Sequence, residues 1–304
     1  MKRYSKSTFT KNRNKLIYFA KYIETHFNKG ILNADKKEVL HFLENDIDKR
    51  KIVRVTKEKW RYFINSYYNY IEKLKKLDKE IFFNPVPGPD FFQFYEKEIT
   101  IEDLEKEEEM LTYETTERIL KHYYYTNFMI FVIVCLLLYT GARISEIISI
   151  KLSNINLQER FIFVKIKSKK YLNQFGFYFF PKFFVRHLEI WIGQLELIYP
   201  DTIFLFPSSR SNFRHLTGKT VRHNLRDIKK LLNLEEHCNP HAFRNLLNEK
   251  REAMGVSKLK RTILLNQKPQ GVNEKNYLKS YKTRKKLLGF YDESFPFPEF
   301  NPYK

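Results

Sequence analysis

The sequence contains little cysteine and lacks the apolar core of a signal peptide. Two cysteines, Cys135 and Cys238, among 304 residues exclude a disulfide framework and fit a reducing compartment. The first residues, MKRYSKSTFTKNRNK, are basic but contain no apolar run of the secretory kind. Internal repeats are also absent from the sequence. We therefore expect a protein of the cytoplasm.

Acidic residues are outnumbered as well. The chain has 55 Lys+Arg against 35 Asp+Glu, which gives a formal net charge of +20. A protein this basic is suited to a polyanion, with nucleic acid favoured over an anionic membrane surface. The 28 Phe and 20 Tyr are too many for a disordered basic chain, so a packed core is expected. The length favours two domains over one.

One segment lacks charge altogether. Between His122 and Arg143 the chain reads YYYTNFMIFVIVCLLLYTGA, which is long enough to span a bilayer by length alone. The alternative is a helix buried in a soluble core. Burial is favoured, because polar residues dilute one end and the helical pattern resumes beyond Gly141. We expect a buried helix over 123–140 and no membrane association.

Helical periodicity dominates the first part of the chain. Apolar residues recur at helical spacing in three stripes over residues 10–77, and Asp35 is the candidate cap of the second. A nearly all-positive run with interleaved tyrosines predicts a DNA-facing surface, although a solvated helical face is the alternative. The residues assigned to this surface are Lys49, Arg50, Lys51, Arg54 and Lys57.

A domain boundary is indicated between residues 84 and 110. The segment NPVPGPDFF ends the helical pattern with three prolines and a glycine, and the acidic stretch ITIEDLEKEEEML then reverses the sign of the charge. We assign a helical domain to 1–97, a linker to 98–110, and a second domain to 111–304 with a tail over 284–304.

The second domain is predicted to be mainly helical with a small antiparallel β-sheet. Helices are expected from the caps Thr112 and Thr115 onward. Residues 161–180, FIFVKIKSKKYLNQFGFYFF, alternate and are rich in aromatic and branched side chains, which predicts a β-hairpin or a three-stranded sheet. Further helices are predicted over 143–151, 182–198, 218–233 and 241–254.

Three motifs follow one another in this domain. TGARISEII places Arg143 three residues before Glu146, NPHAFRNLL has an H-x-x-R pattern ending at Arg244, and LLNQKPQGVNEKNYL contains Tyr277. Each motif alone occurs by chance in many chains. In this order and spacing they resemble the tyrosine recombinases, the Xer/phage-integrase family of DNA breaking-rejoining enzymes. The resemblance covers residues 111–283.

Two arginines fit the chemistry that this resemblance implies. Attack on a DNA phosphodiester adds negative charge to its non-bridging oxygens, which two guanidinium groups can clamp bidentately. Arg143 and Arg244 are the expected pair, and Glu146 is expected to hold Arg143 in place. An ordinary surface pair three residues apart is the alternative for Arg143 and Glu146.

The nucleophile implied by the resemblance is Tyr277, with Tyr281 as the alternative. A phenol becomes a good nucleophile once its proton is removed and its oxyanion lies among cations. The product would be a 3′-phosphotyrosyl link that conserves the bond energy, so that resealing requires neither metal nor ATP. Packing is the alternative role for any one of 20 tyrosines.

The remaining catalytic roles are also carried over from the resemblance. His241 lies one helical turn before Arg244 and is expected to transfer a proton and contact the phosphate. Lys167 is expected to protonate the leaving 5′-oxygen, with Lys165 and Lys169 as alternatives if the strand register differs. A solvated strand lysine is the simpler interpretation of Lys167.

The sequence departs from the family at residues 266–268. Many family members have Gly-His there, whereas this chain has Asn266, Gln267 and Lys268. Gln267 is expected to hydrogen-bond the phosphate and Lys268 to supply a cation. No metal site is expected at His237, Cys238 and His241, because no cysteine pair or H-x-x-x-H completes it, and no cofactor is expected.

The resemblance implies a site-specific recombinase, either an integrase or a resolvase. It would pair an N-terminal helical core-binding (SAM-like) domain with a catalytic domain and act as a homo-tetramer on double-stranded DNA with a specific recombination site, nucleoid-associated. The tail over 284–304 is expected to dock on a neighbouring protomer or on its own domain, or to be disordered. The alternatives are a type IB topoisomerase, a telomere-resolvase-like enzyme, or a DNA-binding protein with a decayed active site.

Overall fold

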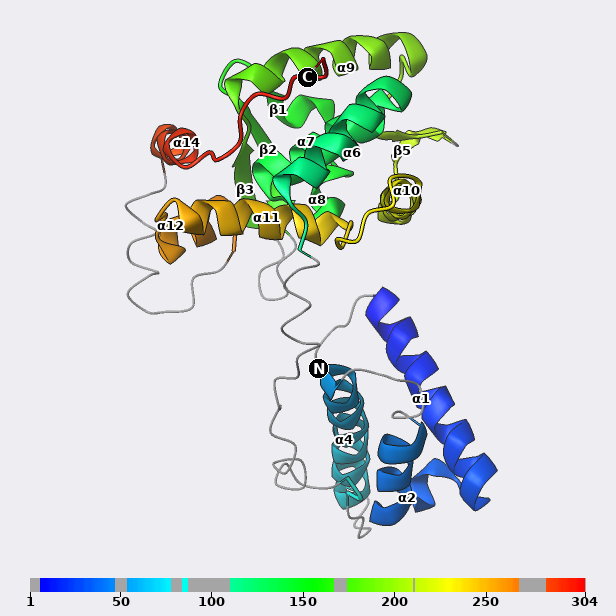
Figure 1. Ribbon diagram of the computed structural model, residues 1–304. Coiled ribbons are helices and arrows are strands. Elements are labelled where there is room, and N and C mark those ends of the chain that lie inside the picture. Colours follow the sequence, from blue (N-terminus) through cyan, green and yellow to red (C-terminus); the bar gives the residue numbers. More distant parts are fainter. Residues whose placement is uncertain are drawn as a thin grey trace. The chain divides into compact units, whose positions relative to one another are not determined.

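The structure, a computed structural model, describes residues 6–46, 54–77, 84–86, 110–166, 174–209, 211–267 and 283–303. The chain divides into two compact units, Met1–Glu98 and Ile99–Lys304 (Figure 1). Each unit has its own hydrophobic core. The described part is mainly helical with a small antiparallel sheet, so the predicted fold class is confirmed. Of the predicted linker over 98–110, only Met110 is described.

The first unit is built around aromatic packing between helices. Its elements are α1 (Lys6–Phe27), α2 (Lys36–His41) and α4 (Arg54–Leu77), a 3-10 turn at Ile31–Asn33 and a π-helical turn at Phe42–Asp46. Phe42 packs between Phe19 of α1 and Trp60 of α4, with ring centroids 4.8 and 5.5 Å apart. The predicted cap is confirmed, since the Asp35 carboxylate accepts a hydrogen bond from the backbone N–H of Glu38 at 3.0 Å.

The second unit carries most of the helices. They are α6 (Tyr113–Thr126), α7 (Phe128–Thr140), α8 (Ile144–Ile147), α9 (Val185–Ile198), α10 (Gly218–Leu231), α11 (Pro240–Ala253), α12 (Lys258–Leu264) and α14 (Arg284–Glu293). Two 3-10 turns cover Leu152–Asn154 and Lys182–Phe184. The helices predicted over 182–198, 218–233 and 241–254 are confirmed as α9, α10 and α11, whereas α12 and α14 were not predicted.

The predicted sheet has three antiparallel strands in the order β1–β2–β3. β2 (Phe161–Ile166) pairs with β3 (Gln174–Phe179) along its whole length, with Phe161 opposite Phe179 and Ile166 opposite Gln174. The third strand, β1 (Ile155–Asn156), pairs with β2 and precedes residues 161–180, the segment in which the strands were predicted. A second sheet, which the sequence did not indicate, pairs β4 (Pro207–Ser208) with β5 (Ser211–His215).

The uncharged segment forms a core helix. Every residue of α7 from Ile130 to Thr140 is buried, and α6, α9 and α11 all pack against it (Figure 1). Within the described ranges, no helix has both the length and the apolar character that crossing a bilayer requires. The prediction of one helix over 123–140 is wrong at its start: α6 ends at Thr126, and Asn127 caps α7 by accepting a hydrogen bond from the Ile130 N–H at 3.1 Å.

The helix predicted over 143–151 is shorter than expected. α8 ends at Ile147, a turn follows at Ile148 and Ser149, and Lys151 has an extended backbone with φ −92° and ψ 148°. The carbonyl of Ile150 accepts a hydrogen bond from the N–H of Leu205 at 2.9 Å, and the next residue forms a β-bridge. A helix cannot continue through a residue with the extended backbone that this bridge requires, so the predicted helix ends before Lys151.

The tail over 284–304 docks on its own unit, which is one of the alternatives that the sequence left open. α14 lies against β2 and β3 in a small apolar cluster. Its Tyr291 is buried and donates a hydrogen bond to the carbonyl of Tyr139 at 3.1 Å. Asp292 forms an ion pair with Arg160 at 2.6 Å. The described part of the tail is therefore packed into the second unit in this structure.

Candidate active site

A pocket of about 410 Å³, here named the arginine pocket, opens where motifs far apart in the sequence meet. Three arginines and one histidine lie in its wall beside neutral residues, and no lining residue carries a carboxylate. The lining residues are Ala142, Arg143, Ile144, Arg222, Asn239, Pro240, His241, Arg244 and Gln267. Such a wall suits an anion, because every formal charge that it presents is positive.

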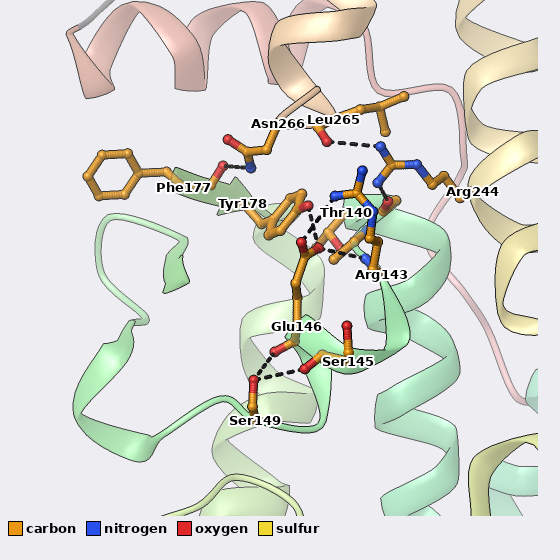
Figure 2. A network of polar contacts seen from close by, with 12 residues as sticks. Thr140, Arg143, Ser145, Glu146, Ser149, Phe177, Tyr178, Arg244, Leu265 and Asn266 are labelled. Atoms are coloured by element: carbon orange, nitrogen blue, oxygen red, sulfur yellow. Dashed lines mark hydrogen bonds and ion pairs between the residues drawn. The ribbon is translucent and has the colours of Figure 1, made fainter. Parts of the chain in front are cut away.

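Arg143 is held at the start of α8 by a buried carboxylate. The Glu146 carboxylate accepts a hydrogen bond from the backbone N–H of Arg143 at 2.9 Å and pairs with its guanidinium at 3.1 Å (Figure 2). The Glu146 side chain is 1% exposed, whereas that of Arg143 is 45% exposed. The predicted contact is therefore present, and it fixes the base of Arg143 while leaving part of its guanidinium open to the pocket.

Tyr178 of β3 supports the same carboxylate. Its hydroxyl donates a hydrogen bond to Glu146 at 2.8 Å, as Figure 2 shows. Burial, reinforced by the charge of Glu146, raises the pKa of Tyr178, so the hydroxyl stays protonated and remains a donor. The sequence did not single out Tyr178, because an inward-facing tyrosine in an alternating strand looks like ordinary core packing.

Arg244 is anchored at the ends of two helices. Its guanidinium donates a hydrogen bond to the carbonyl of Gly141, which follows α7. It donates a second to the carbonyl of Leu265, which follows α12, at 3.0 Å (Figure 2). Carbonyls at helix C-termini carry partial negative charge and suit a cation. These two bonds use two of the five guanidinium N–H groups, so further donors remain for a ligand.

The two arginines influence each other electrostatically. Burial lowers the pKa of Arg244, the neighbouring Tyr178 hydroxyl opposes this change, and the positive charge of Arg143 lowers it further. The Glu146 carboxylate pairs with Arg143 and offsets part of this repulsion, and a bound anion would offset more of it. The geometry therefore indicates a site that binds negative charge.

Gly141 allows α11 and α12 to pack closely against the end of α7. It has φ +63° and ends α7, a backbone conformation that suits glycine. A Cβ at this position would lie 2.5 Å from a methyl carbon of Leu265 and 3.1 Å from one of Leu247. Glycine at this position therefore lets both leucines pack against the end of α7, where Arg244 reaches the Gly141 carbonyl, and any side chain would have to displace them in a strained backbone conformation.

His241 and Arg244 come from the first turns of α11. Asn239 caps this helix, accepting hydrogen bonds from the N–H groups of His241 at 2.9 Å and Ala242 at 3.2 Å, and Pro240 occupies the first helical position. His241 is exposed and Arg244 is buried, and both line the arginine pocket, as the one-turn spacing predicted.

The segment after α12 brings Gln267 to the pocket wall. Asn266 adopts a left-handed conformation with φ +49°, and its side-chain amide donates a hydrogen bond to the carbonyl of Phe177 at 2.9 Å. This bond ties the end of α12 to β3. Arg222 of α10 reaches the pocket from another side, and the sequence analysis did not name it.

Several predicted site residues lie outside the described residues. Among the catalytic candidates these are Lys167, Lys268 and Tyr277, and among the DNA-binding candidates Lys49, Arg50 and Lys51. Arg54 and Lys57 belong to α4, but their side chains are outside the description. Their roles stay predictions.

No group of three or more His, Cys, Asp or Glu side chains in the described part of the chain is arranged to hold a metal ion. Burial raises the pKa of the Cys238 thiol to about 12, so the thiol is protonated at neutral pH rather than a thiolate ligand. This cysteine packs against the apolar core instead.

The fold of the chain is that of the tyrosine recombinases. A lambda integrase dimer bound to a COC′ core site is similar with a TM-score of 0.62 at 16% identity, over 90% of this chain and 72% of that one. The Tn1549 transposon integrase in complex with a circular intermediate DNA has a TM-score of 0.63 at 12% identity, over 92% and 95%. XerH bound to difH substrate has a TM-score of 0.56 at 17% identity, over 88% and 77%.

The sequence leads to the same class. Residues 109–289 match the phage integrase family, and the chain belongs to that family. It is also 24% identical over 274 residues to tyrosine recombinase XerC of Oceanobacillus iheyensis, over 81% of this chain and 79% of that protein. The family suggested by the three sequence motifs is therefore confirmed, and the chain is a tyrosine recombinase.

Replacing Gly141 with Ala tests the close approach of α11 and α12 to α7. We expect a loss of at least about 2 kcal/mol in the free energy of unfolding, because the added methyl group meets Leu265 and requires a left-handed alanine. Denaturant unfolding measures this loss. Gly193→Ala in α9 is the control: nothing lies within 4 Å of its Cβ position, so a gain of about 0.5–1 kcal/mol is expected. Equal stability of both variants would contradict the packing argument.

Replacing Tyr178 with Phe tests the support of Glu146. We expect a loss of about 1–2 kcal/mol in stability together with slower DNA cleavage, since Arg143 loses a rigid base. The matched control is Tyr123→Phe. The Tyr123 hydroxyl donates a hydrogen bond of 2.7 Å to the carbonyl of Asn224, and neither residue lines the arginine pocket. This variant should lose similar stability with unchanged cleavage. If the two variants cleave equally well, Tyr178 only packs.

Proposed function

We propose that the chain is a site-specific recombinase that cleaves and rejoins duplex DNA through a 3′-phosphotyrosyl intermediate. The observation that carries this proposal is the arginine pocket, in which Arg143 meets His241 and Arg244 of α11, about a hundred residues later in the sequence. The match to the phage integrase family supports the type of reaction, DNA strand cleavage and rejoining. A phosphodiester is an anion of the size and charge that this pocket suits.

The arginines supply the electrostatic part of the reaction. Negative charge builds up on the non-bridging oxygens of the phosphate as it becomes five-coordinate. Arg244 is fixed by two carbonyls and Arg143 by Glu146, so neither has to reorganise when the charge develops. Fixed donors of this kind account for a large share of enzymatic rate enhancement, about a hundredfold or more for each donor.

The proton transfers are assigned to residues around this clamp. Tyr277 attacks phosphorus, its phenolic proton passes to His241 or to water, and the bond to the 5′-oxygen breaks. Lys167 gives a proton to that departing oxygen. Gln267 donates a hydrogen bond to the phosphate and Lys268 adds a cation nearby. One phosphoester bond forms as another breaks, so the reaction needs no ATP, and the guanidinium groups supply the charge that a metal ion would otherwise provide.

The partner is proposed to be double-stranded DNA carrying a specific recombination site, bound by a homo-tetramer. Two observations support this. The chain carries a net charge of +20, and a lambda integrase tetramer bound to a Holliday junction has a similar fold, with a TM-score of 0.60. The basic residues Lys49, Arg50, Lys51, Arg54 and Lys57 are proposed to contact the DNA backbone. The protein would then be associated with DNA in the cytoplasm.

Replacing Tyr277 with Phe tests the nucleophile. We expect complete loss of the covalent protein–DNA adduct on a nicked suicide substrate, with DNA binding unchanged, because the phenol oxygen is the atom that joins phosphorus. The substrate comes from mapping DNA bound by the protein in the source genome. Tyr281→Phe is the matched control and should retain the adduct. An adduct with Tyr277→Phe, or its loss only with Tyr281→Phe, would contradict the assignment.

A further inference from the structure

A third arginine lines the arginine pocket. Arg222 lies on α10, one turn beyond Gly218, and long helical side chains lean toward the N-terminus of their helix. A Cβ on Gly218 would lie 3.6 Å from both terminal nitrogens of Arg222 and 3.7 Å from Ile144. The guanidinium therefore lies back over the first turn of α10, beside the start of α8 that Arg143 precedes.

Arg222 differs in its contacts from Arg226 and Lys229, two other basic residues of the same helix. Arg226, one turn further on, donates a hydrogen bond to the imidazole of His223 at 2.7 Å and lies 3.7 Å from the carboxylate of Asp227. Lys229 donates to two backbone carbonyls at 2.8 and 2.9 Å. Among the described residues, no hydrogen bond or ion pair joins Arg222 to a protein group.

The position of Arg222 is electrostatically unfavourable without a ligand. Its charge lies at the positive end of the α10 dipole, in a pocket that already contains Arg143 and Arg244 and no carboxylate. Arg222 is exposed, so its charge remains hydrated while its guanidinium lies along the pocket wall. An anion in the pocket would attract all three guanidinium groups, and this attraction would outweigh the repulsion among them.

We propose that Arg222 is a third phosphate-binding arginine, which contacts a non-bridging oxygen of the same phosphodiester that Arg143 and Arg244 clamp. This inference rests on the proposed function. It makes Arg222 a catalytic residue rather than one of many surface cations that hold DNA. Its contact strengthens as negative charge develops on phosphorus, so its effect belongs to the cleavage step itself.

The test compares Arg222→Ala, Arg222→Lys and Arg226→Ala in the full chain. We expect Arg222→Ala to slow adduct formation by about 10- to 100-fold at saturating DNA, and Arg222→Lys to restore part of that rate. Arg226→Ala should change the saturated rate by less than about threefold, since its guanidinium is engaged with His223 and Asp227. Measuring the rate at saturating DNA separates cleavage from affinity.

Two results would overturn the inference. One is an Arg222→Ala variant that binds DNA more weakly but cleaves at the normal rate once saturated. The other is an equal loss of rate in Arg226→Ala, which would show a general effect of positive charge on α10.

A second readout separates this inference from the proposed function. If the wild-type chain forms no adduct, the proposed function fails, and binding of inorganic phosphate decides the role of Arg222. Phosphate binding, followed by ³¹P line width, should weaken in Arg222→Ala and not in Arg226→Ala. Equal phosphate binding by both variants and the wild-type chain would overturn the phosphate contact.

Discussion

The hydrogen bond from the Arg244 guanidinium to the carbonyl of Gly141 is the contact on which the rest of the site depends. It joins α11 to the end of α7, the most deeply buried helix of the second unit. Because Gly141 has no side chain, Leu247 and Leu265 can close over it. The packing of apolar side chains around the end of α7 thus determines the position and orientation of the Arg244 guanidinium.

A similar arrangement holds the second arginine. Glu146 would be costly to bury alone, but it accepts hydrogen bonds from Arg143 and from Tyr178 of the sheet. Two arginines that repel each other are therefore each held by separate parts of the fold. The site is prepared for an anion before the anion binds, which is what catalysis by fixed charges requires. The docked tail adds to this rigidity, since Tyr291 bonds to a carbonyl near the end of α7.

Sequence alone predicted those parts of the site that belong to ordered motifs. Arg143, His241 and Arg244 were expected together because their order and spacing match a family, and the buried helix was expected from its lack of charge. Tyr178 could not be predicted, since its role depends on which strand residue faces Glu146. Arg222 was hidden among many basic residues, and only its placement in three dimensions distinguishes it. Helix ends at Asn127 and Ile147 depended on caps and strand contacts that periodicity does not report.

The most direct measurement of the central claim removes the negative charge from the DNA rather than the positive charge from the protein. Arg143→Ala and Arg244→Ala would be assayed for covalent adduct on a suicide substrate with either the natural phosphodiester or a methylphosphonate at the scissile position. If both guanidinium groups act by neutralising that phosphate, each variant should lose far less activity on the methylphosphonate than on the natural DNA. A loss of the same size on both substrates would mean that these arginines do not act on the phosphate charge.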